Sequence, residues 1–125
     1  MKILESAEDY LEMILMLSKE KEFVRSVDIA TGLGVTKPSV SVAMHKLHEN
    51  GYIEFAENSY IRLTDSGLEI AERTLERHNK LTGFLVALGV NEETAADDAC
   101  RMEHVLSDES FAAICRHADE IRKKR

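Results

Sequence analysis

The chain has 125 residues, 44% hydrophobic and 31% charged, and its 23 acidic residues outnumber its 16 lysines and arginines to give a net charge of −7. This balance is typical of a soluble globular chain of one or two small domains and excludes a disordered one. It also excludes a strongly basic, non-specific nucleic-acid binder, although a specific binder needs positive charge only on the face that meets phosphate.

The sequence carries no sign of export or membrane insertion. No apolar run approaches the roughly 20 residues that a membrane-spanning helix needs. The N-terminus has an acidic residue where a signal peptide needs an apolar core. We therefore expect a cytoplasmic chain with no membrane partner, in which Cys100 and Cys115 are reduced thiols.

Three helices are expected in the first fifty residues. An acidic first turn after Ser6 predicts a helix that ends at the charged break of residues 19–22. A short helix fits residues 26–33, with Ser26 as its cap. Thr36 is a good cap for the third helix, which runs to about Asn50 and places Val40, Met44 and Leu47 inward.

Two β-prone runs follow, at residues 52–56 and 60–64, with polar residues between them. They predict a hairpin. Two short helices joined by a glycine-containing turn and followed by a hairpin predict a winged helix-turn-helix over residues 1–64.

The winged unit predicts a surface that reads DNA. The second helix of such a unit enters the major groove with its N-terminal residues, where small hydroxylated side chains allow close approach and the helix N-terminus attracts phosphate. A winged helix that makes only protein contacts is the alternative. The residues expected to contact DNA are Thr36, Lys37, Pro38, Ser39, Ser41, Lys46 and, in the wing, Arg62.

Residues 65–125 predict a second, helical domain, so that the whole chain is mainly α. Thr64 caps a long helix that Gly89 closes, Asn91 caps another from about 92 to 106, and Ser107 opens the last. This domain has more apolar side chains than its own core needs. This excess therefore predicts a homodimer surface drawn from Leu81, Phe84, Leu85, Val86, Leu88, Val105, Leu106, Phe111 and Ile114.

A metal-ligating cluster lies in the second of these helices. Cys100, Glu103 and His104 stand at i, i+3 and i+4 and leave one face of a helix within a single turn. Thiolate, carboxylate and imidazole together suit Fe(II), Co(II), Ni(II) or Zn(II) better than Mg or Ca. A second acidic pair, Asp9 and Glu12, stands at i and i+3 in the first helix. A metal site attached to a DNA reader is the most economical interpretation.

The segment from Asp97 to Glu109, together with residues 8–12 and the pair Arg77-His78, resembles the diphtheria toxin repressor family of iron-dependent and manganese transport regulators. The resemblance covers essentially the whole chain. It implies a homodimer that binds double-stranded operator DNA when loaded with metal and represses metal uptake genes. The implied metal ligands are Asp9, Glu12, His78, Cys100, Glu103 and His104.

The chain departs from both branches of that family. The iron branch places a methionine where Asp9 stands, and the manganese branch places a glutamate where Cys100 stands. Thr82 and Ala96 replace the ligands of the iron branch's ancillary site, and the chain leaves no room after Arg125 for that branch's SH3-like domain. The thiol makes Fe(II) the first candidate for the bound metal. The short architecture and Asp9 make Mn(II) the second, and Zn(II), Co(II) and Ni(II) are further alternatives.

Two other classes compete with a metal-dependent repressor. An enzyme is not expected, because no glycine-rich phosphate loop or nucleophile elbow appears and the chain is too short for a second substrate domain. A winged-helix regulator that senses redox state or a small molecule through Cys100 and Cys115 is the alternative.

Overall fold

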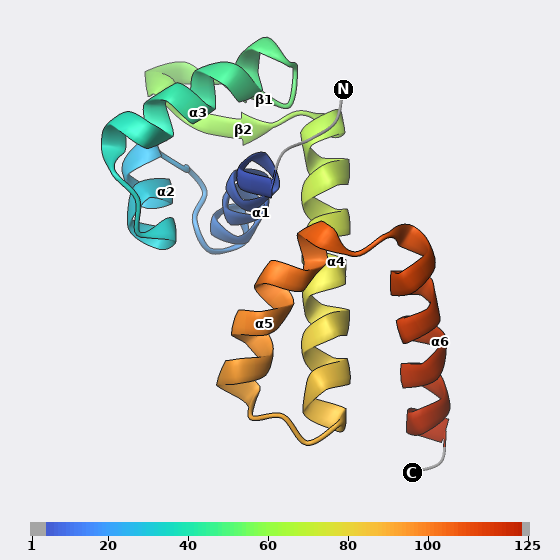
Figure 1. Ribbon diagram of the computed structural model, residues 1–125. Helices are drawn as coiled ribbons and strands as arrows, with labels where there is room; N and C mark the ends of the chain where they lie inside the picture. The colour runs from blue at the N-terminus through green and yellow to red at the C-terminus, as the bar shows by residue number, and fades with distance from the viewer. Residues whose placement is uncertain (1–4, 124–125) are drawn as a thin grey trace. The chain divides into compact units, whose positions relative to one another are not determined.

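The computed structural model describes residues 5–123, with side chains from Ser6 to Ile121 (Figure 1). These residues form six α-helices and one two-stranded antiparallel sheet, which confirms the mainly α prediction. No described helix has the length and apolar character that crossing a bilayer demands. The elements in chain order are α1 (Glu5–Glu20), α2 (Ser26–Leu33), α3 (Lys37–Glu49), β1 (Ile53–Phe55), the short 3₁₀ helix η1 (Glu57–Ser59), β2 (Ile61–Leu63), α4 (Asp65–Ala87), α5 (Glu92–Val105) and α6 (Asp108–Lys123).

The chain divides into two compact units that meet within α4, one up to Arg73 and one from Thr74. The sequence places the domain boundary nearer the hairpin, between residues 64 and 65. That boundary stays a prediction; it falls at the start of α4, whereas the division at Arg73 falls inside that helix.

In the N-terminal unit, α1, α2 and α3 contact one another, α1 also contacts β2, and α3 also contacts β1. The inward positions predicted for α3, at Val40, Met44 and Leu47, are buried. Other buried apolar side chains of this unit are Leu11, Ile14, Leu15, Val24, Ile29, Ala30, Ile53, Ile61 and Ala71. The three helices and the hairpin therefore share one core.

The wing is a short hairpin tied to the rest of its unit. Ile53 pairs with Leu63, and Phe55 pairs with Ile61. The Ile61 N–H also donates to the Val24 carbonyl at 2.8 Å, so a residue next to α2 extends the pairing. At the tip, Asn58 adopts a left-handed conformation (φ 61°), which asparagine tolerates better than most residues.

The helix starts follow the sequence predictions in part. Thr36 caps α3 as expected, since its Oγ1 accepts the Ser39 N–H at 3.3 Å. The predicted caps Ser6 and Ser26 are wrong, because both lie inside their helices. Arg25 is the cap of α2, and its N–H donates to the Asp28 carboxylate at 3.0 Å. The Asp28 side chain thus reaches back from the first turn to satisfy the N–H of the cap residue.

Gly67 occupies a place in the first turn of α4 that no larger residue fits. A Cβ there meets the carbonyl oxygen of Tyr52, which already accepts the Thr64 N–H at 3.1 Å. Backbone atoms cannot turn away as a flexible side chain can. We expect Gly67→Ala to lower the free energy of unfolding by about 3 kcal/mol or more, at the upper end for overpacking. Urea unfolding measures this, with Gly83→Ala, which meets nothing within 4 Å, as the matched control; equal stability of the two variants contradicts it.

The C-terminal unit contains the second part of α4 with α5 and α6. Leu81 of α4 and Ala95 and Ala99 of α5 are fully buried. As predicted, Gly89 ends the α4 segment in a left-handed conformation (φ 104°), and Asn91 caps α5 by accepting the Glu93 N–H at 2.9 Å. Small residues on the buried face of α5 permit close packing against its neighbour.

Candidate functional site

A buried carboxylate continues the apolar stripe of α5. Ala95, Ala99 and Glu103 follow one another at four-residue spacing and therefore share a face of the helix. The first two are fully buried, and Glu103 is only 2% exposed. Burying a carboxylate is unfavourable unless hydrogen bonds or positive charge compensate for the lost water. The stripe thus leads to a group that needs polar partners.

Two histidines supply those partners. The Nδ1 atom of His78, on α4, lies 2.9 Å from Oε2 of Glu103, and the Nε2 atom of His104, on α5, lies 3.3 Å from Oε1. The His104 side chain is 1% exposed. Burial lowers the pKa of the His78 imidazole below its usual value, and the nearby His104 lowers it further. A lowered pKa favours the neutral imidazole, which is the form that binds metal ions.

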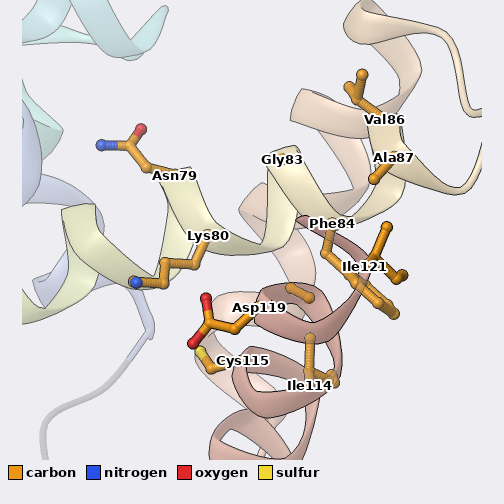
Figure 2. A pocket seen from close by; sticks show the side chains of 11 residues that line it. Asn79, Lys80, Gly83, Phe84, Val86, Ala87, Ile114, Cys115, Asp119 and Ile121 are labelled. Atoms are coloured by element: carbon orange, nitrogen blue, oxygen red, sulfur yellow. The ribbon is translucent and has the colours of Figure 1, made fainter. Parts of the chain in front are cut away.

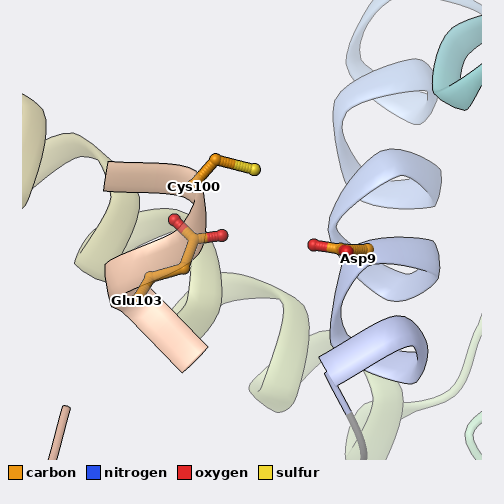
Figure 3. A group of neighbouring side chains, drawn as sticks. All are labelled: Asp9, Cys100 and Glu103. Carbon is orange, nitrogen blue, oxygen red and sulfur yellow. The ribbon is translucent and has the colours of Figure 1, made fainter. Parts of the chain in front are cut away.

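Cys100 adds a thiol to this group. Its Sγ atom lies within 4.8 Å of a Glu103 carboxylate oxygen, one turn away on α5. Figure 3 draws these two side chains on α5 together with Asp9 on α1. Cys100 is exposed, Cys115 is half-buried, and the two form no disulfide with each other. A redox switch between them stays a prediction.

Within the C-terminal unit, the predicted ligands His78, Cys100 and His104 thus each approach a fourth, Glu103. The donor set of two imidazoles, a carboxylate and a thiol fits a borderline divalent transition metal. Asp9 and Glu12 lie on α1 in the N-terminal unit, half-buried and one turn apart. The ligand roles of all six residues stay predictions.

One side chain at this site, Arg77, has no role that its position in the sequence predicts. Arg77, next to His78, donates to the carbonyl oxygens of Glu103 and Leu106 at 3.4 and 2.9 Å and forms an ion pair with Asp108. Basic residues commonly satisfy the last carbonyls of a helix. The Arg77-His78 pair was the available signal, but no spacing rule connects residue 77 to the end of α5.

All seven residues predicted to contact DNA are exposed: Thr36, Lys37, Pro38, Ser39, Ser41, Lys46 and Arg62. Arg62 lies 3.6 Å from the Glu54 carboxylate across the wing, which lowers the net positive charge there. Val42 is also exposed on α3, and the sequence analysis missed it. Its place off the stripe of residues 40, 44 and 47 is the signal that could have found it.

The C-terminal unit also exposes apolar surface. A cavity of about 440 Å³ between α4 and α6 is lined in part by Phe84, Ile114 and Cys115 (Figure 2). Val105 is 76% exposed near the end of α5. Of the residues suggested for a dimer surface, Leu81 belongs instead to the core, because it is fully buried.

A winged helix-turn-helix joined to a helical unit with a cluster of metal-ligand side chains defines a class of metal-responsive transcriptional regulators. Comparison with known families agrees. Residues 2–60 match the N-terminal DNA-binding domain of the iron-dependent repressors, and residues 64–124 match their metal-binding and dimerisation domain. The chain belongs to this family of metal-dependent transcriptional repressors, whose members are regulators and not enzymes.

Individual relatives support the assignment. An uncharacterised helix-turn-helix transcriptional regulator of Methanocaldococcus jannaschii is 38% identical over 96% of this chain and 98% of its own length. The regulator MntR of Bacillus pumilus is 39% identical over 87% of this chain and 76% of its own. A solved manganese-dependent transcriptional repressor in complex with manganese is 31% identical, with a TM-score of 0.80. That match covers 90% of this chain but 53% of the solved one.

Proposed function

We propose that this chain is a homodimeric repressor that binds operator DNA when it is loaded with Fe(II) or Mn(II), and that it controls genes of metal homeostasis. The observation that carries the proposal is Glu103, a buried carboxylate between two imidazoles, in the segment that matches a metal-binding domain. A buried acid with this environment is far better explained by a cation than by packing.

Six side chains would hold the metal. His78, Cys100, Glu103 and His104 come from the C-terminal unit, and Asp9 and Glu12 come from α1. When bound, the metal supplies the positive charge that allows carboxylates and a thiolate to share one site. Without it, carboxylates gathered at a shared site would repel one another. The ligand set would therefore couple the orientation of the DNA-binding unit to metal.

The proposed coupling between metal binding and DNA binding also involves the residues that contact DNA. In the proposed dimer the two α3 helices meet successive half-sites, and Thr36, Lys37, Pro38, Ser39, Ser41, Lys46 and Arg62 contact the DNA. The dimer surface would draw on exposed apolar residues of the C-terminal unit such as Val86, Leu88 and Val105. Because linkage is reciprocal, operator DNA should tighten metal binding by the factor that metal tightens DNA binding.

Cys100 decides the proposed metal preference. A thiolate favours Fe(II), Co(II) or Zn(II) over the harder Mn(II), while Asp9 and Glu12 supply the oxygen donors that Mn(II) prefers. The relatives named MntR and the solved manganese-dependent repressor make Mn(II) the next candidate. We therefore place Fe(II) first and Mn(II) second, with Zn(II), Co(II) and Ni(II) possible.

Operator binding against metal tests the proposal. Random DNA duplexes are selected on the full chain under anaerobic conditions with Fe(II), and the affinity for the enriched sequence is then measured with and without a chelator. We expect an inverted repeat whose affinity falls by roughly 5- to 150-fold on chelation, the usual range of coupling between two sites. Enriched DNA that binds equally well in excess chelator contradicts metal dependence.

A further inference from the structure

We infer that Arg77 is a positioning residue for the metal site, acting through the backbone of α5. The inference rests on the proposed function, because it concerns how the proposed ligands are held. Neighbouring residues of α4 contact the same residue of α5 in two ways. His78 meets the Glu103 side chain at 2.9 Å, and Arg77 donates to the Glu103 carbonyl oxygen at 3.4 Å.

The Arg77 guanidinium lies where the C-terminus of α5 needs a donor. The last four carbonyls of a helix have no partner within it, and Glu103 belongs to this turn of α5. A second bond, to the Leu106 carbonyl at 2.9 Å, holds the residue that caps the helix. The positive charge also suits the negative end of the helix dipole. One side chain thus fixes the turn that carries both Glu103 and His104.

The same guanidinium is fixed from the side of α6. It pairs with Asp108, the first residue of that helix, and lies 4.8 Å from the centre of the Phe111 ring. The Arg77 side chain is 12% exposed, whereas the Asp108 side chain is 99% exposed. The carbonyl bonds and the ring contact are therefore better shielded from water than the ion pair, and we assign the positioning to them.

Lysine cannot take over this role. The planar guanidinium directs several N–H groups at fixed angles and can serve carbonyls, a carboxylate and a ring face together, whereas an ammonium is a single point charge. Arg77→Lys keeps the charge near the end of α5 and loses the fork. The variant therefore separates positioning of the ligand turn from simple electrostatic attraction.

The test titrates Co(II) into the full-length chain and follows the visible absorption of the bound ion. We expect Arg77→Lys to weaken Co(II) binding by about 10- to 100-fold, as loss of a residue that orients metal ligands commonly does. We also expect an altered spectrum at saturation, which a merely less stable fold does not produce. Arg73→Lys, an exposed arginine one turn earlier on α4, is the matched control and should change the affinity by less than roughly twofold.

Two further variants decide between contacts. Asp108→Asn should lower the Co(II) affinity by less than about fivefold, because an exposed ion pair contributes little. Phe111→Leu removes the ring above the guanidinium and should lower the Co(II) affinity by about two- to fivefold. If circular dichroism finds metal-free Arg77→Lys unfolded, Phe111→Leu becomes the test variant. A wild-type Co(II) affinity and spectrum of Phe111→Leu would then overturn the inference.

The outcomes separate the inference from the function beneath it. If the wild-type chain binds no Co(II), the metal site itself is wrong and the role of Arg77 falls with it. If the wild type binds Co(II) and folded Arg77→Lys matches Arg73→Lys in affinity and spectrum, only the positioning role is overturned. A loss in Asp108→Asn as large as that in Arg77→Lys also overturns it, because the ion pair would then carry the effect.

Discussion

Glu103→Gln is expected to abolish metal-dependent DNA binding while the chain stays folded and dimeric. Glutamine keeps the volume of the buried side chain but removes the negative charge between His78 and His104. Because the position is buried, water cannot easily supply a substitute ligand. We expect a loss of metal affinity beyond the about 10- to 100-fold typical of residues that only orient ligands.

Thermal unfolding gives this prediction a second, independent measurement. Replacing a buried charge by a neutral group of similar size is often neutral or stabilising. Metal-free Glu103→Gln should therefore melt at or above the temperature of the metal-free wild type, while losing the increase that bound metal gives a native protein. Glu93→Gln, an exposed glutamate on the same helix, is the matched control. A variant that still gains stability from Fe(II) contradicts the role of Glu103.

Cys100→Glu is expected to change which metal the chain prefers. It replaces a soft thiolate by a carboxylate, which suits Mn(II) better than Zn(II) or Co(II). Cys100 is exposed, so the substitution should leave the core and the helix content unchanged. We expect the ratio of Mn(II) to Zn(II) affinity to rise by at least about tenfold, or roughly 1.4 kcal/mol.

Competition titrations with the two ions measure that ratio directly. Cys115→Ser removes the chain's other thiol and should leave the ratio at its wild-type value. If Cys100→Glu also leaves the ratio unchanged, the thiol is not a ligand. A shift in the serine variant instead would point to the cavity between α4 and α6.

Local structure was predictable from the sequence where a residue could play only one structural role, such as filling a buried face or capping a helix. The spacing of Val40, Met44 and Leu47 identified a buried helix face, and Thr36 identified the start of α3. The cap predicted at Ser26 was wrong by one residue, because the cap is Arg25, whose N–H donates to the Asp28 carboxylate. Local rules place an element but leave its first residue uncertain by one or two positions.

The site was predictable as far as it lies on one helix. Helical spacing alone brings Cys100, Glu103 and His104 to neighbouring positions. The approach of His78 depends on how α4 packs against α5, and the contacts of Arg77 depend on where α5 ends. Neither follows from periodicity. The ligand role predicted for Asp9 is implied by the family resemblance, because pairing between residues so far apart in the chain leaves no trace in a single sequence.

The burial difference between Cys100 and Glu103, two predicted ligands on α5, bears on how such regulators diversify. Glu103 extends the alanine stripe into the core, while Cys100 lies exposed one turn away. A substitution at residue 103 has to fit the interior of the protein, whereas one at the exposed residue 100 should leave the stability of the fold nearly unchanged. A change of metal preference could therefore evolve through a single substitution at the exposed residue 100.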